Sequence, residues 1–123
     1  MAIAGLVGVA VFTRRSNFDA MRRFYVEALG LVPLSDRPGF VNFEWDGIRL
    51  TVAVHSELAA ANPEPRHVMI NLGTDDIDRD VARLRRSGVP IVRPPEVEHW
   101  GGRVATVTDP DGNYVQLLEF PRV

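Results

Sequence analysis

The sequence predicts an α+β fold built from two tandem βαβββ modules, and an internal repeat is the main observation behind this prediction. Corresponding landmarks recur at spacings of 59, 58 and 65 positions: the helix starts at Phe18 and Ile77, the helix ends at Gly30 and Gly88, and the Asp-Gly turns at Asp46 and Asp111. Helices protect only one face of each module's sheet. We therefore expect a curved eight-stranded mixed sheet with the helices on its outer face and a concave ligand groove.

The same landmarks divide the chain. We expect a single domain over residues 1–123, in which a first module at 5–55 and a second at 67–120 are joined by a linker at 56–66. The linker, SELAAANPEPR, starts as a short helical piece and ends in prolines that break it. A chain of 123 residues suffices for one such domain.

Capping and periodicity justify the two helices. Ser16 or Asn17 can cap the first helix, and its apolar face carries Phe18, Met21, Tyr25 and Leu29. Acidic residues at the start and arginines near the end of the second helix complement its dipole. Its buried stripe is predicted to be Ile77, Val81 and Leu84.

Apolar runs and turn residues justify the strands. The run from Leu6 to Phe12 opens the first module, and FVNFEW and IRLTVAV flank its Asp-Gly hairpin turn. HVMINL opens the second module, in which RVATVT and YVQLLEF flank the turn DPDGN.

Composition excludes several classes of function. The chain has 46% hydrophobic and 24% charged residues, no cysteine, and a formal net charge of −2. The missing cysteines exclude disulfides and thiolate sites, and the absent basic excess disfavours nucleic-acid binding. No apolar run approaches the length of a membrane span, and the N-terminal apolar run lacks a preceding basic region. We expect a cytoplasmic protein with neither nucleic-acid nor membrane partners.

Three segments carry a resemblance to a known superfamily: FDAMRRFYVEALGL in the first half, TDDID in the second, and Trp100-Gly101 with Arg103 before DPDGNYVQLLE. With these motifs the chain resembles the vicinal oxygen chelate superfamily of glyoxalase I, bleomycin resistance proteins and extradiol dioxygenases. The resemblance runs from about Leu6 to Glu119 and implies the fold predicted above. It leaves function open, because this fold carries binders as well as enzymes.

The resemblance also implies four inward-facing positions where metal-dependent members carry His, Glu or Gln. Carried over to this chain, they fall on Thr51, Met69, Gln116, and Ala10 or Gly8. Hydroxyl, thioether, amide and methyl groups are poor ligands for a hard divalent cation. We therefore expect no metal cofactor at these positions.

Two histidines keep an alternative open. Strand alternation places His55 on the face of Thr51 and His67 on the face of Met69. A displaced site for a divalent metal such as Zn, Ni, Fe or Mn is conceivable there, completed by Glu44 or Glu119. The competing interpretation is that both histidines are solvated residues at strand ends.

The loop before the last hairpin supplies further candidates. Trp100 can stack on a flat ligand or cover the hairpin edge, and its WGGR context resembles bleomycin resistance proteins. Arg103 can bind an anionic group or pair locally with Glu96 or Glu98.

These observations favour a protein that binds a small, mostly apolar or aromatic molecule in the groove without a catalytic metal. The predicted ligand-binding residues are Thr51, Met69, Asn71, Trp100, Arg103 and Gln116. Two alternatives stay open: a metal-dependent lyase, isomerase or dioxygenase using His55 and His67, and a metal-free enzyme using a carboxylate such as Glu44. We also predict a homodimer, because open sheet edges are a liability in a monomer.

Overall fold

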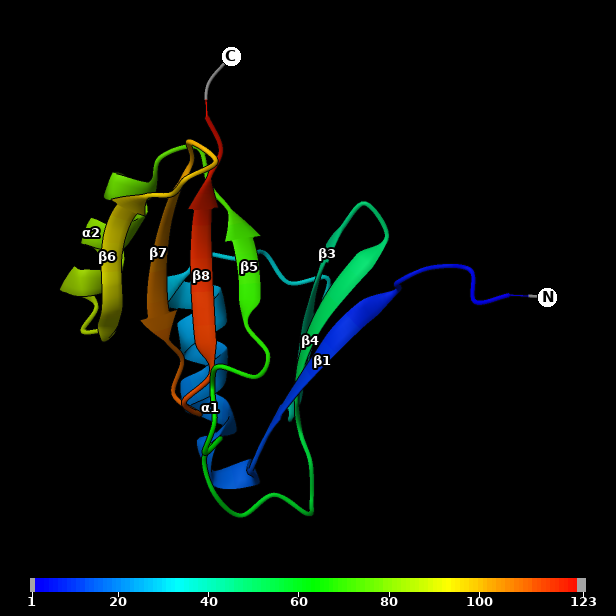
Figure 1. The fold of residues 1–123 in the computed structure, drawn as a ribbon. Helices are drawn as coiled ribbons and strands as arrows, with labels where there is room; N and C mark the ends of the chain where they lie inside the picture. The colour runs from blue at the N-terminus through cyan, green and yellow to red at the C-terminus, as the bar shows by residue number, and fades with distance from the viewer. Residues whose placement is uncertain (1, 122–123) are drawn as a thin grey trace. The chain divides into compact units, whose positions relative to one another are not determined.

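The protein, described over residues 2–121 in a computed structural model, folds as two compact units, unit 1 (Met1–Ala61) and unit 2 (Asn62–Val123). The boundary between the units falls inside the segment 56–66. Each unit runs in the order strand, helix and three strands (Figure 1). The predicted α+β fold of two βαβββ modules is confirmed.

Unit 1 contains four strands and one helical segment. The strands are β1 (Gly8–Thr13), β2 (Ser35–Arg37), β3 (Phe40–Trp45) and β4 (Ile48–Val54). The helical segment consists of a 3-10 turn (Arg15–Asn17), α1 (Phe18–Arg22) and a π-helical stretch (Arg23–Ala28).

Unit 2 repeats the plan with one regular helix. Its strands are β5 (Ile70–Gly73), β6 (Ile91–Val97), β7 (Arg103–Thr108) and β8 (Tyr114–Glu119), and its helix is α2 (Ile77–Arg86).

Strand pairing gives each unit its own mixed sheet. The strand order is β1-β4-β3-β2 in unit 1 and β5-β8-β7-β6 in unit 2. In both sheets the first strand pairs in parallel with the last one, and the other pairings are antiparallel. Backbone pairing thus makes two sheets of four strands, and not the single sheet of eight that we predicted.

The predicted turns have the backbone geometry that their residues favour. Asp46 and Gly47 both have positive φ, +50° and +83°, as a two-residue type I′ hairpin turn requires. Gly30 and Gly88 end their helical segments with φ of +76° and +81°.

The first helix departs from the regular α-helix expected there. The Leu29 N–H donates to the Phe24 carbonyl at 2.8 Å, an i→i+5 bond that defines the π-helical stretch. The wider turn leaves Phe24 and Tyr25 both buried, with their rings edge to face at 4.9 Å. Of the two predicted capping residues, Asn17 makes no side-chain cap bond, and its amide instead donates to Thr13 Oγ1 at 3.1 Å.

The second helix follows the prediction. The Asp76 carboxylate accepts a hydrogen bond from the Arg79 N–H at 3.1 Å and caps the helix. The predicted stripe is buried, with exposed fractions of 0–3% at Ile77, Val81 and Leu84. This stripe packs α2 against one face of the unit 2 sheet (Figure 1).

Each sheet therefore has a helix-covered face and a helix-free face. In unit 1 the covered face buries Val41, Phe43, Leu50 and Val52, and the Phe43 ring lies 6.4 Å from the ring of Tyr25. Because side chains alternate along a strand, the residues between them lie on the helix-free face.

Candidate functional site

In unit 1, three paired residues form a row across the helix-free face. Thr51 on β4 is the Cα partner of Ala10 on β1 and of Asn42 on β3. A hollow of about 460 Å³ opens beside this row, lined by residues of β1, β3 and β4 that include Ala10 and Thr51. This volume lies within the range of roughly 300–1,000 Å³ typical of small-molecule sites. The prediction for Thr51 thus falls on a hollow of suitable size.

The wall of this hollow depends on a glycine and an ion pair. A Cβ atom at Gly8 would lie 2.4 Å from the carbonyl oxygen of Arg49, so only glycine lets β1 approach β4 this closely. The Arg49 guanidinium donates to Glu44 Oε1 at 3.0 Å. Glu44, considered above as a metal ligand or as a base, is therefore already paired with Arg49.

Unit 2 carries a matching row of polar side chains. Gln116 on β8 is the Cα partner of Asn71 on β5 and of Thr106 on β7. The Gln116 amide donates to Thr106 Oγ1 at 3.4 Å, and Thr106 is buried. Asn71 and Gln116, both predicted to bind ligand, therefore lie side by side on the helix-free face.

The register also moves one predicted position. Counting back along the sequence placed the partner of Gln116 at Met69, but β5 begins only at Ile70 and the paired residue is Asn71. Met69 precedes the strand and is half-buried. The pairing Ala10–Thr51 in unit 1 corresponds to Asn71–Gln116 in unit 2, which favours Ala10 over Gly8 as the repeat-related position.

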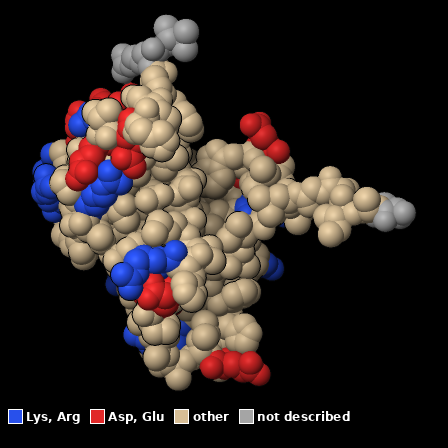
Figure 2. All heavy atoms as spheres, in the orientation of Figure 1, with Lys and Arg blue, Asp and Glu red and all other residues tan. Residues whose placement is uncertain are grey.

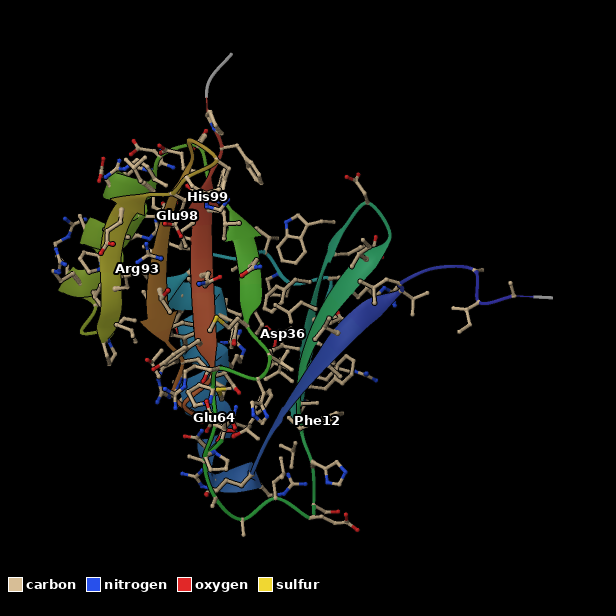
Figure 3. All side chains as sticks on the ribbon, in the orientation of Figure 1. Phe12, Asp36, Glu64, Arg93, Glu98 and His99 are labelled. Carbon is tan, nitrogen blue, oxygen red and sulfur yellow. The ribbon has the colours of Figure 1, made fainter. Side chains whose placement is uncertain are left out.

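A charged network continues this row onto β6. Arg93, paired with Thr106 in the sheet, donates to Glu98 at 2.8 and 3.1 Å and to Glu96 at 3.2 Å. Hydrogen bonds from Arg93 lower the pKa of Glu98. Figure 2 shows charged side chains gathered over β6, and Figure 3 shows Arg93 and Glu98 on β6 and the loop after it. The two glutamates thus pair with Arg93, and not with Arg103 as considered above.

Arg103 lies on the opposite face of the same sheet. Its guanidinium donates to both carboxylate oxygens of Asp78 on α2, at 2.7 and 2.9 Å. Its Cα partner Glu119 also faces the helix, since Glu119 Oε2 accepts from the Ile77 N–H at 2.9 Å. Arg103 therefore fastens β7 to α2 and lies away from the face of Asn71 and Gln116.

The Arg103–Asp78 pair predicts a pH response. The guanidinium lowers the pKa of Asp78 by hydrogen bonding, so the pair stabilises the folded state above the ordinary aspartate pKa. This stability is lost as the pH falls through the lowered pKa of the folded state. In Arg103→Gln the carboxyl resonance of Asp78, followed by NMR, should titrate at a higher pH than in the unchanged protein. An unchanged midpoint would contradict the assignment.

Two aromatic rings lie at the end of the helix-free face of unit 2. The rings of Trp100 and Phe120 are 5.6 Å apart, and the two residues are 39% and 64% exposed. Gly102 and Phe120 follow the alternation of Thr106 and Gln116, so both belong to the helix-free side. The Trp100 ring occupies the space beside Gly102, where a Cβ atom would come within 1.9 Å of it.

Sequence analysis identified Trp100 but missed Phe120. The signal was present, because Phe120 continues the alternation of Gln116 and Leu118 just beyond β8. The pair gives this face an exposed aromatic surface at the end of β8, four residues beyond Gln116 of its polar row.

Comparison with known proteins agrees with this architecture. A family model described as the Glyoxalase/Bleomycin resistance protein/Dioxygenase superfamily matches residues 9–117. The chain belongs to this superfamily. It is 42% identical over 110 residues to a bleomycin resistance protein of Klebsiella pneumoniae, and the match covers 84% of each chain.

Solved structures of the superfamily's fold are similar over nearly the whole chain. TnmS3, an antibiotic binding protein from Streptomyces sp. CB03234, is 30% identical with a TM-score of 0.71, covering 98% of this chain and 99% of its own. A lactoylglutathione lyase from Agrobacterium tumefaciens has the same TM-score at 18% identity, covering 96% of this chain and 95% of its own. The second likeness shows the fold alone.

The residues at the positions that carry metal in some members of the superfamily do not fit a divalent cation. The paired positions hold a methyl group at Ala10, a hydroxyl at Thr51, and amides at Asn71 and Gln116. A catalytic cation in a protein needs three or four converging nitrogen or oxygen donors, chiefly imidazole and carboxylate. Within each unit, over the described residues 2–121, no three His, Asp or Glu side chains are placed to hold a metal ion.

The histidines of the alternative metal site lie outside the strands. His55 follows the end of β4, its Nδ1 accepts from the Glu57 N–H at 3.1 Å, and its ring contacts Phe12 edge to face at 5.4 Å. His67 is exposed in the turn before β5. Of the carboxylates considered with them, Glu119 caps α2 and Glu44 pairs with Arg49.

Over residues 2–121, the helices are too short or too polar to span a membrane.

Proposed function

We propose that the protein binds an antibiotic through a flat, mostly apolar or aromatic part of that molecule, on the helix-free face of unit 2, and leaves the antibiotic chemically unchanged. The exposed pair of Trp100 and Phe120 carries this proposal, because exposed aromatic rings are suited to stacking on a flat ligand. The 42% identity to a bleomycin resistance protein and the likeness to TnmS3 support the class of ligand.

Polar groups on the same face of the unit 2 sheet supply orientation. The amides of Asn71 and Gln116 can each donate and accept hydrogen bonds. None of these groups is a nucleophile or a general base at neutral pH. Binding without turnover is therefore the chemistry that they favour, and we propose that it proceeds without a metal cofactor.

Bleomycin itself is the probe for this function. The metal content of the purified protein is measured first. Bleomycin titrated into this protein should then bind and change its tryptophan fluorescence, and mass spectrometry should show that the drug is chemically unaltered. Trp100→Ala should weaken binding by about thirtyfold, equivalent to about 2 kcal/mol, as for an interface hot spot. Trp45→Ala is the matched control, because Trp45 is similarly exposed at 45% but lies on the unit 1 hairpin.

Other outcomes would contradict the proposal. A chemically modified drug would indicate an enzyme, and equal losses in the two tryptophan variants would remove Trp100 from the site. One tightly bound Zn, Ni, Fe or Mn ion per chain, lost in His55→Ala or His67→Ala, would instead favour a metal-dependent lyase, isomerase or dioxygenase.

We also propose that the protein acts as a cytoplasmic homodimer. In the unit 1 sheet β1 is an edge strand, and Val9 and Phe12 on it are 41% and 40% exposed. Unpaired edges with apolar side chains favour association with a second chain. Sedimentation analysis should give twice the mass of 13.7 kDa, and a single species at the monomer mass would contradict the proposal.

A further inference from the structure

The chain contains two Asp-Gly sequences, Asp46-Gly47 in the turn between β3 and β4 and Asp111-Gly112 in the turn between β7 and β8. In such a sequence the glycine nitrogen can attack the side-chain carboxyl carbon of the aspartate, because glycine has no Cβ atom to hinder the approach. The attack requires a carboxyl group that is free to move and a glycine N–H that no acceptor holds. The structure gives the two sequences opposite surroundings in both respects.

The first sequence is open to this reaction. Asp46 and Gly47 form the tip of a two-residue hairpin turn, and both are exposed. The backbone pairing of the hairpin ends with the residues on either side of them. Within residues 2–121, no hydrogen bond or ion pair holds the Asp46 carboxylate or the Gly47 N–H. The carboxyl carbon and the attacking nitrogen are therefore both available.

The second sequence is held in place. Asp111 is 3% exposed, its N–H donates to Asp109 Oδ1 at 2.9 Å, and its carbonyl oxygen accepts from the Asn62 N–H at 2.8 Å. The Gly112 N–H, which would supply the attacking nitrogen, donates to the Asp109 carbonyl oxygen at 3.0 Å. The Asn62 backbone also lies close to Gly112, since an added Cβ atom there would be 3.2 Å from the Asn62 carbonyl oxygen. This turn has to open before Asp111 can react.

We propose that Asp46 is a site of spontaneous isomerisation to isoaspartate and that Asp111 is protected from it. The Gly47 nitrogen loses its proton and bonds to Asp46 Cγ, while one carboxyl oxygen leaves as water, which gives a cyclic succinimide. Water then adds to the ring carbonyl that came from the Asp46 main chain and breaks its bond to the Gly47 nitrogen. One water is lost and one is regained, so the product has the mass of the original chain and no cofactor takes part.

The product changes the turn and the hollow next to it. The main chain then runs through Cβ and Cγ of residue 46, and the former main-chain carbonyl is a free carboxylate. The longer main chain no longer fits a two-residue turn. Glu44, Gly47 and Arg49 all line the hollow at Thr51, so isomerisation reshapes its wall. None of these residues belongs to the unit 2 face proposed for the antibiotic, and either proposal can fail without the other.

Ageing of the full chain at neutral pH tests the proposal. Peptide mapping by mass spectrometry with electron-transfer fragmentation distinguishes isoaspartate from aspartate at each position. Isoaspartate should accumulate at residue 46 at least about tenfold faster than at residue 111, because residue 111 reacts only from locally opened molecules. In the chain unfolded in urea the two rates should become similar, since the structure then protects neither sequence.

A matched variant checks the assignment. Asp46→Glu keeps the charge but cannot form the five-membered ring, and it should abolish labelling by an isoaspartyl carboxyl methyltransferase supplied with labelled S-adenosylmethionine. The isomerised fraction of the unchanged protein should show shifted NMR resonances for Glu44 and Arg49. The proposal is overturned if aged folded protein carries no isoaspartate at residue 46, or if residues 46 and 111 react equally fast in the folded chain. Equal labelling of Asp46→Glu and the unchanged protein would also overturn it.

Discussion

Gly102→Ala is expected to displace Trp100 and to weaken antibiotic binding about as much as Trp100→Ala does. The added Cβ atom would lie 1.9 and 2.3 Å from two carbons of the indole ring and 2.7 Å from the carbonyl oxygen of Glu119. The backbone of β8 cannot give way without breaking its pairing with β7, so the indole ring has to move. Crowding of this kind costs about 1–3 kcal/mol of stability.

The displacement of Trp100 can be measured directly. In a Trp45→Phe background Trp100 is the one tryptophan left, and its fluorescence and near-ultraviolet dichroism report its packing. Gly73→Ala is the matched control, because Gly73 has no atom within 4 Å of an added Cβ and does not have a positive φ. Wild-type emission and affinity in Gly102→Ala would contradict the geometry described for this loop.

Phe43→Ala is expected to destabilise unit 1 by about 3–5 kcal/mol, the usual cost of truncating a buried phenylalanine. Phe43 is 1% exposed, and its ring lies between those of Tyr25 and Trp45, with 6.4 Å between centres on each side. Truncating it leaves a cavity beside the fully buried ring of Tyr25. Urea unfolding of Phe43→Ala and of the unchanged protein measures the difference in the free energy of unfolding.

Trp45→Ala provides the comparison on the same strand. Trp45 is 45% exposed, and its ring contacts the Phe43 ring from one side only. Its truncation should therefore lower the free energy of unfolding by clearly less than the truncation of Phe43 does. Hydrogen exchange should show the loss of protection in Phe43→Ala concentrated in β3, β4 and the α1 segment. A cost below that of Trp45→Ala would mean that Phe43 does not hold α1 to the sheet.

The fold was predictable because its signals are local and repeated. The Asp-Gly turns, the helix-ending glycines and the stripe of α2 each act within a few residues, and each is confirmed. The π-helical stretch was not predictable in this way. An i→i+5 bond leaves the apolar pattern of Met21, Tyr25 and Leu29 unchanged while bringing Phe24 into the core as well.

The candidate site was predictable only in part, since it depends on register and on partners distant in sequence. The resemblance pointed to Thr51 and Gln116, which the register places on the helix-free faces together with Asn71. It also pointed to Met69, where the strand has not yet begun. Arg103 has glutamates nearby in the sequence and yet pairs with Asp78 of α2. Which of several carboxylates an arginine meets is decided by how the helix packs on the sheet.

The parallel pairing of the first and last strands in each unit has a consequence for synthesis on the ribosome. β1 has its pairing partner once the chain has grown to Val54, whereas β5 has to wait for β8, which ends at Glu119. Since domains tend to fold as units while the chain emerges, the first unit can be complete before the second has its last strand. A nascent chain stalled shortly before β8 would thus display a finished unit 1 and an unpaired β5, a state open to capture by chaperones.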